Sequence, residues 1–194
     1  MVIKSAEFDR SCRSVSQFPD FPFPEFAFMG RSNVGKSSLI NMVLGKKGLV
    51  KTGASPGVTR AVNFFIINKN ISIADLPGYG YAKLPREISK TFAPLIRGYI
   101  ENRGNLRLAF LLVDIRRIPD EKEREMLALL SDKGITVAVL ATKCDKVSRN
   151  KMVVHLRQIC GALGISESSI LPTSARSGEG KKDMLRLIQG YRSK

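Results

Sequence analysis

The chain has 194 residues, of which 43% are hydrophobic, and this length and composition suit one domain with a buried core. Its net charge of +15 exceeds what solubility needs and favours a polyanionic partner, nucleic acid before an anionic membrane surface. Three cysteines without a CxxC pair exclude a disulfide framework and a zinc site, and no apolar run is long enough to span a bilayer.

The sequence predicts an N-terminal arm followed by a single domain. Residues 1–24 show little hydrophobic periodicity and end in a proline-rich stretch, so we expect an extended arm there and one domain over residues 25–194. The apolar run Glu25–Met29 predicts a strand, and the pattern over Lys36–Leu44 predicts a helix.

A phosphate-binding motif lies between this strand and this helix. Gly30–Ser37 matches G-x-x-x-x-G-K-[ST], in which backbone N–H groups surround phosphates at a helix N-terminus. Lys36 is expected to neutralise the β and γ phosphates, and the Ser37 hydroxyl is expected to reach Mg²⁺. The alternative is a glycine-rich turn without nucleotide. The residues predicted to bind here are Gly30, Arg31, Ser32, Asn33, Val34, Gly35, Lys36, Ser37 and Ser38.

The next segment, Lys46–Ala61, is rich in Gly, Lys and Thr and is expected to be a switch loop. We expect the Thr59 hydroxyl to complete Mg²⁺ coordination when the γ-phosphate is present, although a solvated loop threonine is the simpler alternative. The nucleotide-binding residues predicted in this segment are Gly57, Val58, Thr59, Arg60 and Ala61.

A predicted hairpin follows, formed by Asn63–Asn68 and Ile71–Asp75. At its end the sequence reads Asp-Leu-Pro-Gly, where a carboxylate can hold Mg²⁺ through water and the last N–H can meet the γ-phosphate. An ordinary strand-end turn is the alternative. The predicted binding residues are Asp75, Leu76, Pro77 and Gly78. The candidate catalytic residues are Lys36, Thr59 and Gly78.

The remaining chain alternates buried strands with helices, which indicates a mostly parallel sheet covered on both faces. We therefore expect an α/β fold with a six-stranded sheet. The predicted strands are Leu108–Asp114, Ile135–Ala141 and Ile170–Pro172, and the predicted helices are Asp120–Asp132, Ser148–Leu163 and Lys181–Tyr191.

Two loops after these strands carry a candidate base-recognition site. The carboxylate of Asp145 can accept hydrogen bonds from N1–H and the 2-amino group of guanine, a pair of donors that adenine lacks. This argues against an ATP-dependent kinase or ATPase. The Lys143 stem can cover the base, and the Ala175 N–H can meet the guanine O6. The predicted guanine-binding residues are Thr142, Lys143, Cys144, Asp145, Thr173, Ser174 and Ala175.

The hydrolysis machinery departs from that of Ras-type proteins, because Tyr79 stands where those proteins hold the glutamine that orients water. We therefore expect slow intrinsic hydrolysis that an ion or a partner accelerates. Asn33 matches the position at which TrmE-like proteins hold K⁺ beside the phosphates. The alternative, that Asn33 only tolerates an unusual backbone conformation, stays open.

The chain resembles the YihA/EngB/YsxC family of TrmE–Era–EngA-like P-loop GTPases over nearly its whole length. The stretches that carry the resemblance are Gly30–Asn41 (GRSNVGKSSLIN), Asp75–Ala82 (DLPGYGYA), Asp114–Arg117 and Thr142–Lys146. The resemblance implies a Ras-like, Mg²⁺-dependent GTPase that assists assembly of the large ribosomal subunit. It also implies a link to cell division and septation. The three cysteines, read as reduced thiols, predict a cytoplasmic location.

These patterns leave two other classes of function open besides a GTPase switch on a ribosomal precursor: a P-loop kinase or ATPase, and a nucleotide-gated RNA-binding module in which hydrolysis matters little. A monomer is expected. The basic charge fits ribosomal RNA as the partner, although a generally basic proteome would leave the same excess.

Overall fold

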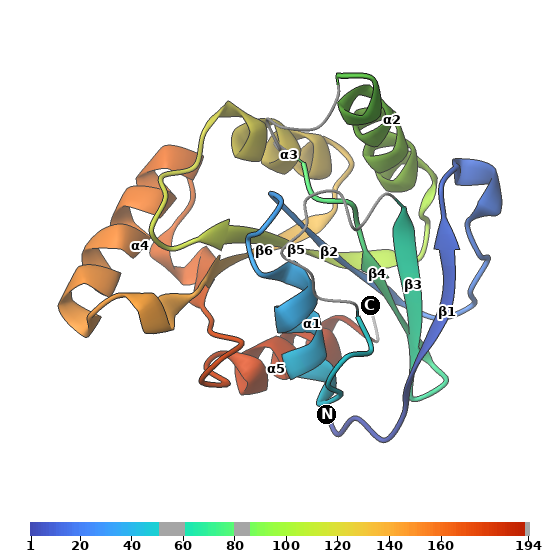
Figure 1. Ribbon diagram of the computed structural model, residues 1–194, viewed down its shortest axis with the longest axis horizontal. Helices are drawn as coiled ribbons and strands as arrows, with labels where there is room; N and C mark the ends of the chain where they lie inside the picture. The colour runs from blue at the N-terminus through green and yellow to red at the C-terminus, as the bar shows by residue number, and fades with distance from the viewer. Residues whose placement is uncertain (51–60, 80–85, 193–194) are drawn as a thin grey trace.

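The computed structural model describes residues 1–50, 61–79 and 86–192, and these form one sheet with helices on both faces (Figure 1). The strands are β1 (Ala6–Cys12), β2 (Glu25–Gly30), β3 (Val62–Ile67), β4 (Ile71–Asp75), β5 (Leu106–Asp114), β6 (Thr136–Thr142) and β7 (Ile170–Pro172). The α-helices are α1 (Lys36–Leu44), α2 (Arg86–Asn102), α3 (Glu121–Asp132), α4 (Arg149–Leu163) and α5 (Lys181–Tyr191).

The sheet has the strand order β1-β3-β4-β2-β5-β6-β7. Strands β4, β2, β5, β6 and β7 run parallel, whereas β3 pairs antiparallel with both β4 and β1. Because parallel strands end at the same edge of a sheet, the loops that follow β2, β4, β5, β6 and β7 gather there. The predicted phosphate and guanine motifs lie in these loops.

Separate hydrophobic clusters cover the two faces of the sheet. Helices α1 and α5 pack on one face, and α2, α3 and α4 pack on the other (Figure 1). Strand β2 is buried along its whole length, which explains its continuous apolar run. The prediction of an α/β fold with a mostly parallel sheet and helices on both faces is confirmed.

The predicted number of strands is wrong, because the sheet in the described part of the chain has seven strands and not six. The additional strand, β1, comes from the segment predicted to be an arm. Its register with β3 shifts between Phe8 and Arg10, which marks a bulge. Ala6 and Cys12, which an unbroken strand would place on one face, therefore belong to opposite clusters. This break hides the two-residue period in the sequence.

The rest of the first 24 residues also contacts the domain. Phe18 packs edge-to-face on Phe64 of β3 and on Tyr99 of α2, with ring centroids 5.7 and 5.8 Å apart. The division into an arm and a domain over residues 25–194 stays a prediction.

Helix α2 was not predicted. Leu95, Ile96, Tyr99 and Ile100 are buried and have the spacing of one helical face. Pro94 lies inside the helix and hides this pattern, since proline removes a backbone hydrogen bond. No helix in the described part of the chain is long and apolar enough to cross a bilayer.

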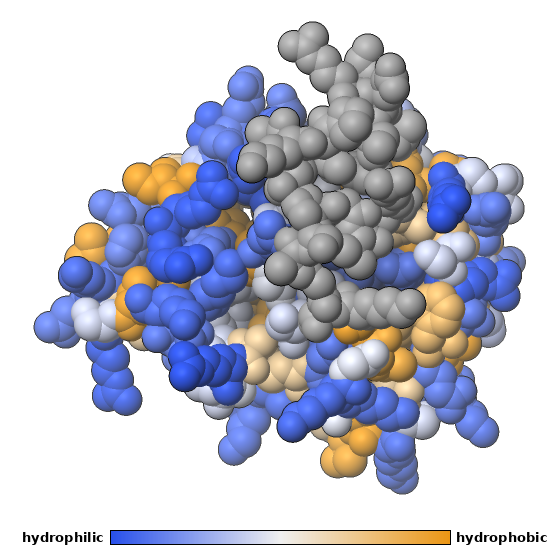
Figure 2. All heavy atoms as spheres, viewed as in Figure 1, coloured by the Kyte–Doolittle hydropathy of each residue, from blue (hydrophilic) through white to orange (hydrophobic). Residues whose placement is uncertain are grey.

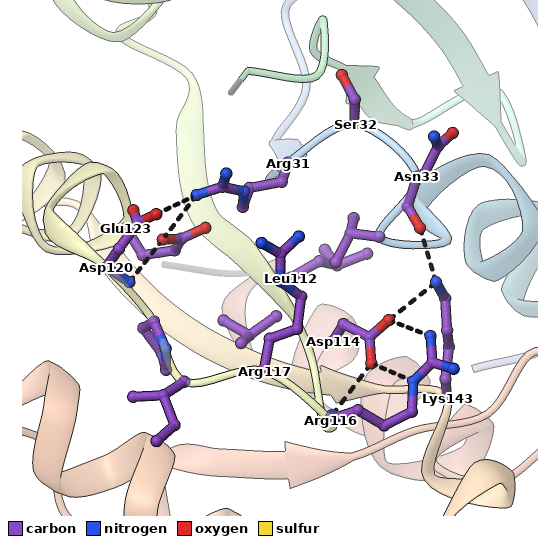
Figure 3. A pocket seen from close by; sticks show the side chains of 14 residues that line it. Arg31, Ser32, Asn33, Leu112, Asp114, Arg116, Arg117, Asp120, Glu123 and Lys143 are labelled. Carbon is purple, nitrogen blue, oxygen red and sulfur yellow. Dashed lines mark hydrogen bonds and ion pairs between the residues drawn. The ribbon is translucent and has the colours of Figure 1, made fainter. Parts of the chain in front are cut away.

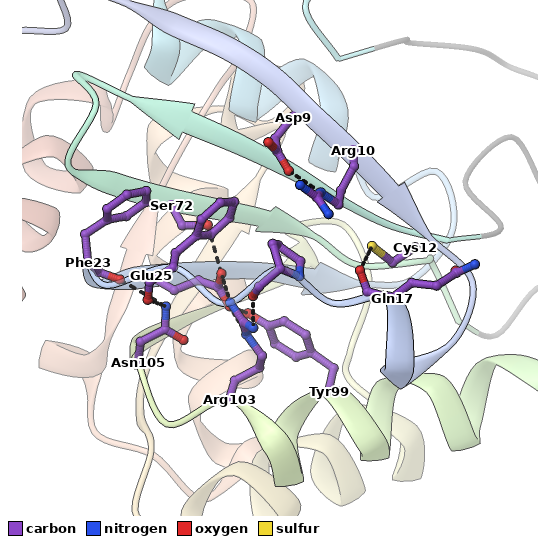
Figure 4. Close-up of polar contacts among 12 residues, drawn as sticks. Asp9, Arg10, Cys12, Gln17, Phe23, Glu25, Ser72, Tyr99, Arg103 and Asn105 are labelled. Carbon is purple, nitrogen blue, oxygen red and sulfur yellow. Dashed lines mark hydrogen bonds and ion pairs between the residues drawn. The ribbon is translucent and has the colours of Figure 1, made fainter.

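A buried polar network fixes the end of α2 to the sheet, at the edge opposite the nucleotide motifs (Figure 4). Glu25 at the start of β2 accepts hydrogen bonds from Ser72 at 2.8 Å and Tyr99 at 2.7 Å. Arg103 forms a bidentate pair with the same carboxylate at 2.8 and 2.7 Å. Burial raises the pKa of Tyr99, so its hydroxyl stays a donor. The buried charge on Glu25 is thus compensated.

Candidate nucleotide-binding site

The phosphate-binding loop joins β2 to α1, as predicted. Gly35 has φ +101°, a left-handed conformation that favours glycine, and it is the N-cap of α1. A Cβ at Gly30 would lie 2.8 Å from the carbonyl oxygen of Leu112, so the loop also needs a small residue there. No side chain caps α1, which leaves the first N–H groups of the helix available to an anion.

Lys36 and Asp75 form a buried ion pair in the centre of the site. The side chains are 7% and 0% exposed, and Lys36 Nζ donates to Asp75 Oδ1. Asp75 Oδ2 is buried and has no hydrogen-bond partner among the described residues. An uncompensated carboxylate oxygen at this depth is costly and suits a cation or a bound water.

The segment after β4 rests on the phosphate-binding loop. Ser32 Oγ donates to the Gly78 carbonyl at 3.2 Å, and the Ser32 N–H donates to the Tyr79 carbonyl at 3.0 Å. A Cβ at Gly78 would lie 3.0 Å from Ser32, so glycine permits this close approach. A change at the phosphates can therefore reach this segment directly.

Tyr79 packs against the cluster between the sheet and helices α2 and α3. Its hydroxyl is buried without a hydrogen-bond partner in the described residues, and burial raises its pKa far above the usual value. A neutral, buried hydroxyl is poorly placed to orient an attacking water. This agrees with the expectation that Tyr79 does not replace the Ras-type glutamine.

The guanine motifs are tied to the phosphate-binding loop by two hydrogen bonds. Thr142 Oγ1, which is buried, donates to the Val34 carbonyl at 2.7 Å. Lys143 Nζ donates to the Asn33 carbonyl at 2.7 Å. The base and phosphate regions are therefore held at a fixed separation.

Asp145 is held by the second guanine loop. Its Oδ1 accepts a hydrogen bond from Ser174 Oγ at 2.7 Å. Ser174 Oγ in turn accepts from the N–H groups of Arg176 and Ser177 at 3.2 and 3.1 Å. These hydrogen bonds orient the Asp145 carboxylate. Its second oxygen, Oδ2, lies 3.9 Å from Lys146 Nζ.

Cys144 and Glu179 provide a link between these loops that the sequence did not predict. Cys144 N–H donates to the Thr173 carbonyl at 3.1 Å, and its thiol donates to Glu179 Oε2 at 3.0 Å. Burial and the bond to Glu179 raise the pKa of Cys144 to about 12, so the thiol stays protonated. No motif in the sequence marks Glu179, because the contact depends on how the loop over residues 176–180 folds.

A cavity of about 340 Å³ opens between the phosphate-binding loop and the guanine loops. Its size falls in the range of small-molecule sites. It brings together predicted residues from three segments and adds Leu39, Lys146 and Arg176, which were not predicted. The lining residues are Val34, Gly35, Ser38, Leu39, Thr142, Lys143, Asp145, Lys146, Ala175 and Arg176.

A second cavity, of about 240 Å³, lies beside the phosphate-binding loop, toward α3 (Figure 3). Arg31, predicted to bind nucleotide, directs its side chain to Asp120 and Glu123 at the start of α3. Asp114 pairs with Arg116 at 2.7 Å and Lys143 at 2.9 Å, and these hydrogen bonds hold its pKa well below the usual value despite burial. This ion pair with Asp114 fixes the Lys143 side chain.

Asn33 has φ +63°, the left-handed conformation that asparagine tolerates better than most residues. The interpretation that Asn33 is present because it tolerates an unusual backbone conformation thus has a structural basis. Its side-chain amide is directed away from Lys143 (Figure 3). The predicted residues Gly57, Val58, Thr59 and Arg60 lie outside the described residues. Ala61 is described and buried, directly before β3.

Comparisons with known proteins agree with this geometry. A family model described as a 50S ribosome-binding GTPase matches residues 25–143. A probable GTP-binding protein EngB from Geobacter metallireducens is 42% identical over 189 residues, covering 97% of this chain and 93% of that protein. The corresponding protein from Desulfatibacillum aliphaticivorans is 44% identical over 184 residues, covering 95% and 90%.

Solved structures show the same fold. The crystal structure of a probable GTP-binding protein EngB superposes with a TM-score of 0.73 at 28% identity, covering 88% of this chain and 100% of that one. Era in complex with MgGDPNP and a 16S ribosomal RNA fragment superposes with a TM-score of 0.67, covering 87% and 56%; at 21% identity it shares the fold alone.

Proposed function

The chain belongs to the EngB family of GTP-binding proteins, and we propose that this GTPase acts as a switch in the assembly of the large ribosomal subunit. The observation that carries the proposal is the contact between Ser32 and the Gly78–Tyr79 segment. Because this segment touches the phosphate-binding loop, loss of the γ-phosphate on hydrolysis can change its conformation and, with it, the surface available to a partner. We also propose the link to cell division and septation that the family resemblance implies.

Nucleotide binding would use residues that the structure already brings together. Lys36 would exchange Asp75 for the β and γ phosphate oxygens, and Asp145 would accept from the guanine edge. The Gly78 N–H would meet the γ-phosphate only in the GTP state. Thr59 is proposed to act in the same state.

The donor set fits Mg²⁺. Asp75 offers a buried oxygen that has no partner in the described part of the chain, and Ser37 follows Lys36 at the start of α1. Thr59 would complete the set. Among the described residues no cluster of three acidic, His or Cys side chains could hold a metal alone. Mg²⁺ in nucleotide sites takes few protein ligands and completes its shell with phosphates and water, so this pattern is the expected one. When bound, Mg²⁺ neutralises the charge that develops on the phosphates.

We expect GTP turnover to depend on K⁺. Because Tyr79 is buried in the core, it does not orient the attacking water, and we propose that a K⁺ ion beside the phosphates assists hydrolysis instead. Turnover in KCl should exceed turnover in NaCl at equal ionic strength by at least about tenfold, or about 1.4 kcal/mol of transition-state stabilisation. Phosphate release measured in the two salts gives the comparison.

The variant Asn33→Gly separates the two interpretations of Asn33, because glycine keeps the left-handed backbone and removes the amide. If the amide holds K⁺, the preference for KCl disappears in this variant. Equal turnover of the unchanged protein in both salts would contradict a K⁺ site.

The partner is proposed to be ribosomal RNA in a precursor of the large subunit. The net charge of +15 supports this, and the first switch segment is itself basic, with Lys47 and Lys51. Lys46, at the start of this segment, is already held by a hydrogen bond from its Nζ to the Ala6 carbonyl at 2.6 Å. Ordering of these segments by γ-phosphate would bring several cations to one surface. Cosedimentation with large-subunit precursors tests the proposal: tighter binding is expected with a non-hydrolysable GTP analogue than with GDP.

A further inference from the structure

The mouth of the guanine cavity is bordered by the N-termini of two helices. Helix α4 begins shortly after the loop that holds Asp145, and α5 begins shortly after the loop that holds Ala175. The bond between Ser174 and Asp145 keeps these loops together, so the two helix ends lie on the same side of the cavity.

Both helix ends carry cations where the helix dipole disfavours them. The first turn of α4 contains Arg149 and Lys151 and no acid. That of α5 contains Lys181, Lys182 and the acid Asp183, and the Lys181 ammonium lies toward Gly45 at the end of α1. Neither helix has a side-chain hydrogen bond at its N-cap. Two such ends side by side concentrate positive potential.

Helix α3 shows that the chain can follow the opposite rule. Its N-cap Asp120 accepts a hydrogen bond from the Lys122 N–H, and Glu121 and Glu123 lie in its first turn. Acids at this end satisfy the free N–H groups and the dipole. The first turn of α4, which holds two cations and no acid, is the opposite of this arrangement.

The acids near these two ends are already engaged. Asp183 pairs with Arg186 at 2.7 Å, and Glu179 accepts from the Cys144 thiol. In the parts of the chain that the structure describes, Arg149, Lys151 and Lys182 are exposed and form no ion pair. To the left of the grey atoms, Figure 2 shows mostly hydrophilic residues with some hydrophobic ones between them. The cations are thus free to meet an external anion.

We propose that this surface, the guanine rim, binds RNA phosphates and that the bound RNA slows release of the nucleotide. The guanine rim consists of Lys146, Arg149, Lys151, Arg176 and Lys182. Lys146 and Arg176 line the cavity itself, so an RNA strand that contacts both helix ends passes over its mouth. The ribosomal origin of the RNA rests on the proposed function.

None of the rim residues is among those proposed to act on the γ-phosphate, Gly78 and Thr59, so the RNA contacts of the rim need no GTP. This distinguishes it from the switch segments. RNA bound there would slow the exit of GDP and GTP alike, and would keep the nucleotide state fixed while the protein is on its partner.

The test measures release of a fluorescent GDP analogue after addition of excess unlabelled GDP. Release is followed for the protein alone, with purified large ribosomal subunits, and with single-stranded poly(U). We expect both RNA probes to slow release at least about fivefold, the lower end of typical coupling between two bound ligands. Raising the salt concentration should remove the effect.

Two triple variants with the same change in charge locate the effect. The rim variant carries Arg149→Gln, Lys151→Gln and Lys182→Gln, and the control variant carries Lys4→Gln, Lys69→Gln and Lys133→Gln at exposed sites near the opposite end of the parallel strands. The rim variant should release GDP normally without RNA and lose the slowing, whereas the control should keep it. Loss of three phosphate contacts should also make the slope of log RNA affinity against log salt concentration shallower by about 2.

The possible outcomes separate this inference from the proposed function. Slowing by poly(U) but not by large subunits supports the guanine rim and contradicts the ribosomal partner. If large subunits bind without slowing GDP release, or if they slow it equally in both triple variants, the proposal that RNA binds at the guanine rim is wrong. Equal slowing by vesicles of phosphatidylglycerol overturns the assignment of RNA as its ligand.

Discussion

Replacing Lys36 by alanine should weaken the binding of GDP and GTP alike by about 10- to 100-fold, because charge-assisted hydrogen bonds of about 1.5–3 kcal/mol to the phosphates are lost. The structure adds a second consequence. Removal of Lys36 leaves Asp75 buried without its ion-pair partner, so the variant should also be less stable. Calorimetric titration with each nucleotide and thermal unfolding measure the two effects.

The double variant Lys36→Ala/Asp75→Ala separates these effects. It removes both buried charges, so its stability should recover while nucleotide binding stays weak. Lys47→Ala is the matched control, since Lys47 is an exposed lysine just beyond the end of α1. If Lys36→Ala binds GDP with unchanged affinity, the assignment of the phosphate-binding loop is wrong.

Replacing Asp145 by asparagine should reverse the preference for the base. We propose that the carboxylate accepts two hydrogen bonds from guanine, and asparagine would put a donor amide where one of them ends. GDP affinity should fall at least about 100-fold, as loss of two bonds to a charged group implies, and XDP affinity should rise. Xanthine fits because its 2-position is an acceptor.

The structure makes Asp145→Asn a mild change in other respects. The asparagine oxygen can still accept from Ser174, so the two guanine loops should stay together. Asp183→Asn on α5 removes the same charge outside the cavity and should leave both affinities unchanged. Unchanged GDP affinity in Asp145→Asn would refute its role in base selection.

The sequence indicated which loops form the candidate site better than it indicated the contacts that hold these loops in place. The phosphate-binding loop was predictable because a glycine-rich turn between a strand and a helix needs Gly35 in a left-handed conformation. Asp75 and Asp145 were predictable because parallel strands end at one edge, which brings the loops after them together. The cavity lined by Val34 and Asp145 is consistent with that reasoning.

Contacts that depend on tertiary packing could not be read from the chain. The bond from Cys144 to Glu179 and the ion pairs of Arg31 join residues far apart in sequence. Strand β1 was missed because its bulge breaks the alternation between faces. Helix α2 was missed because Pro94 lowers its helix propensity, which packing of Tyr99 and its neighbours overrides.

Cosedimentation with ribosomal particles tests the central claim most directly. The protein is mixed with large-subunit precursors in GDP or in a non-hydrolysable GTP analogue, across a salt series, with small subunits as the control particle. The account predicts tighter pelleting with the analogue, on large-subunit particles alone, and a log–log salt slope of about −0.7 per phosphate contact with single strands. Equal pelleting in both nucleotides at every salt concentration would contradict a switch and leave only charge attraction.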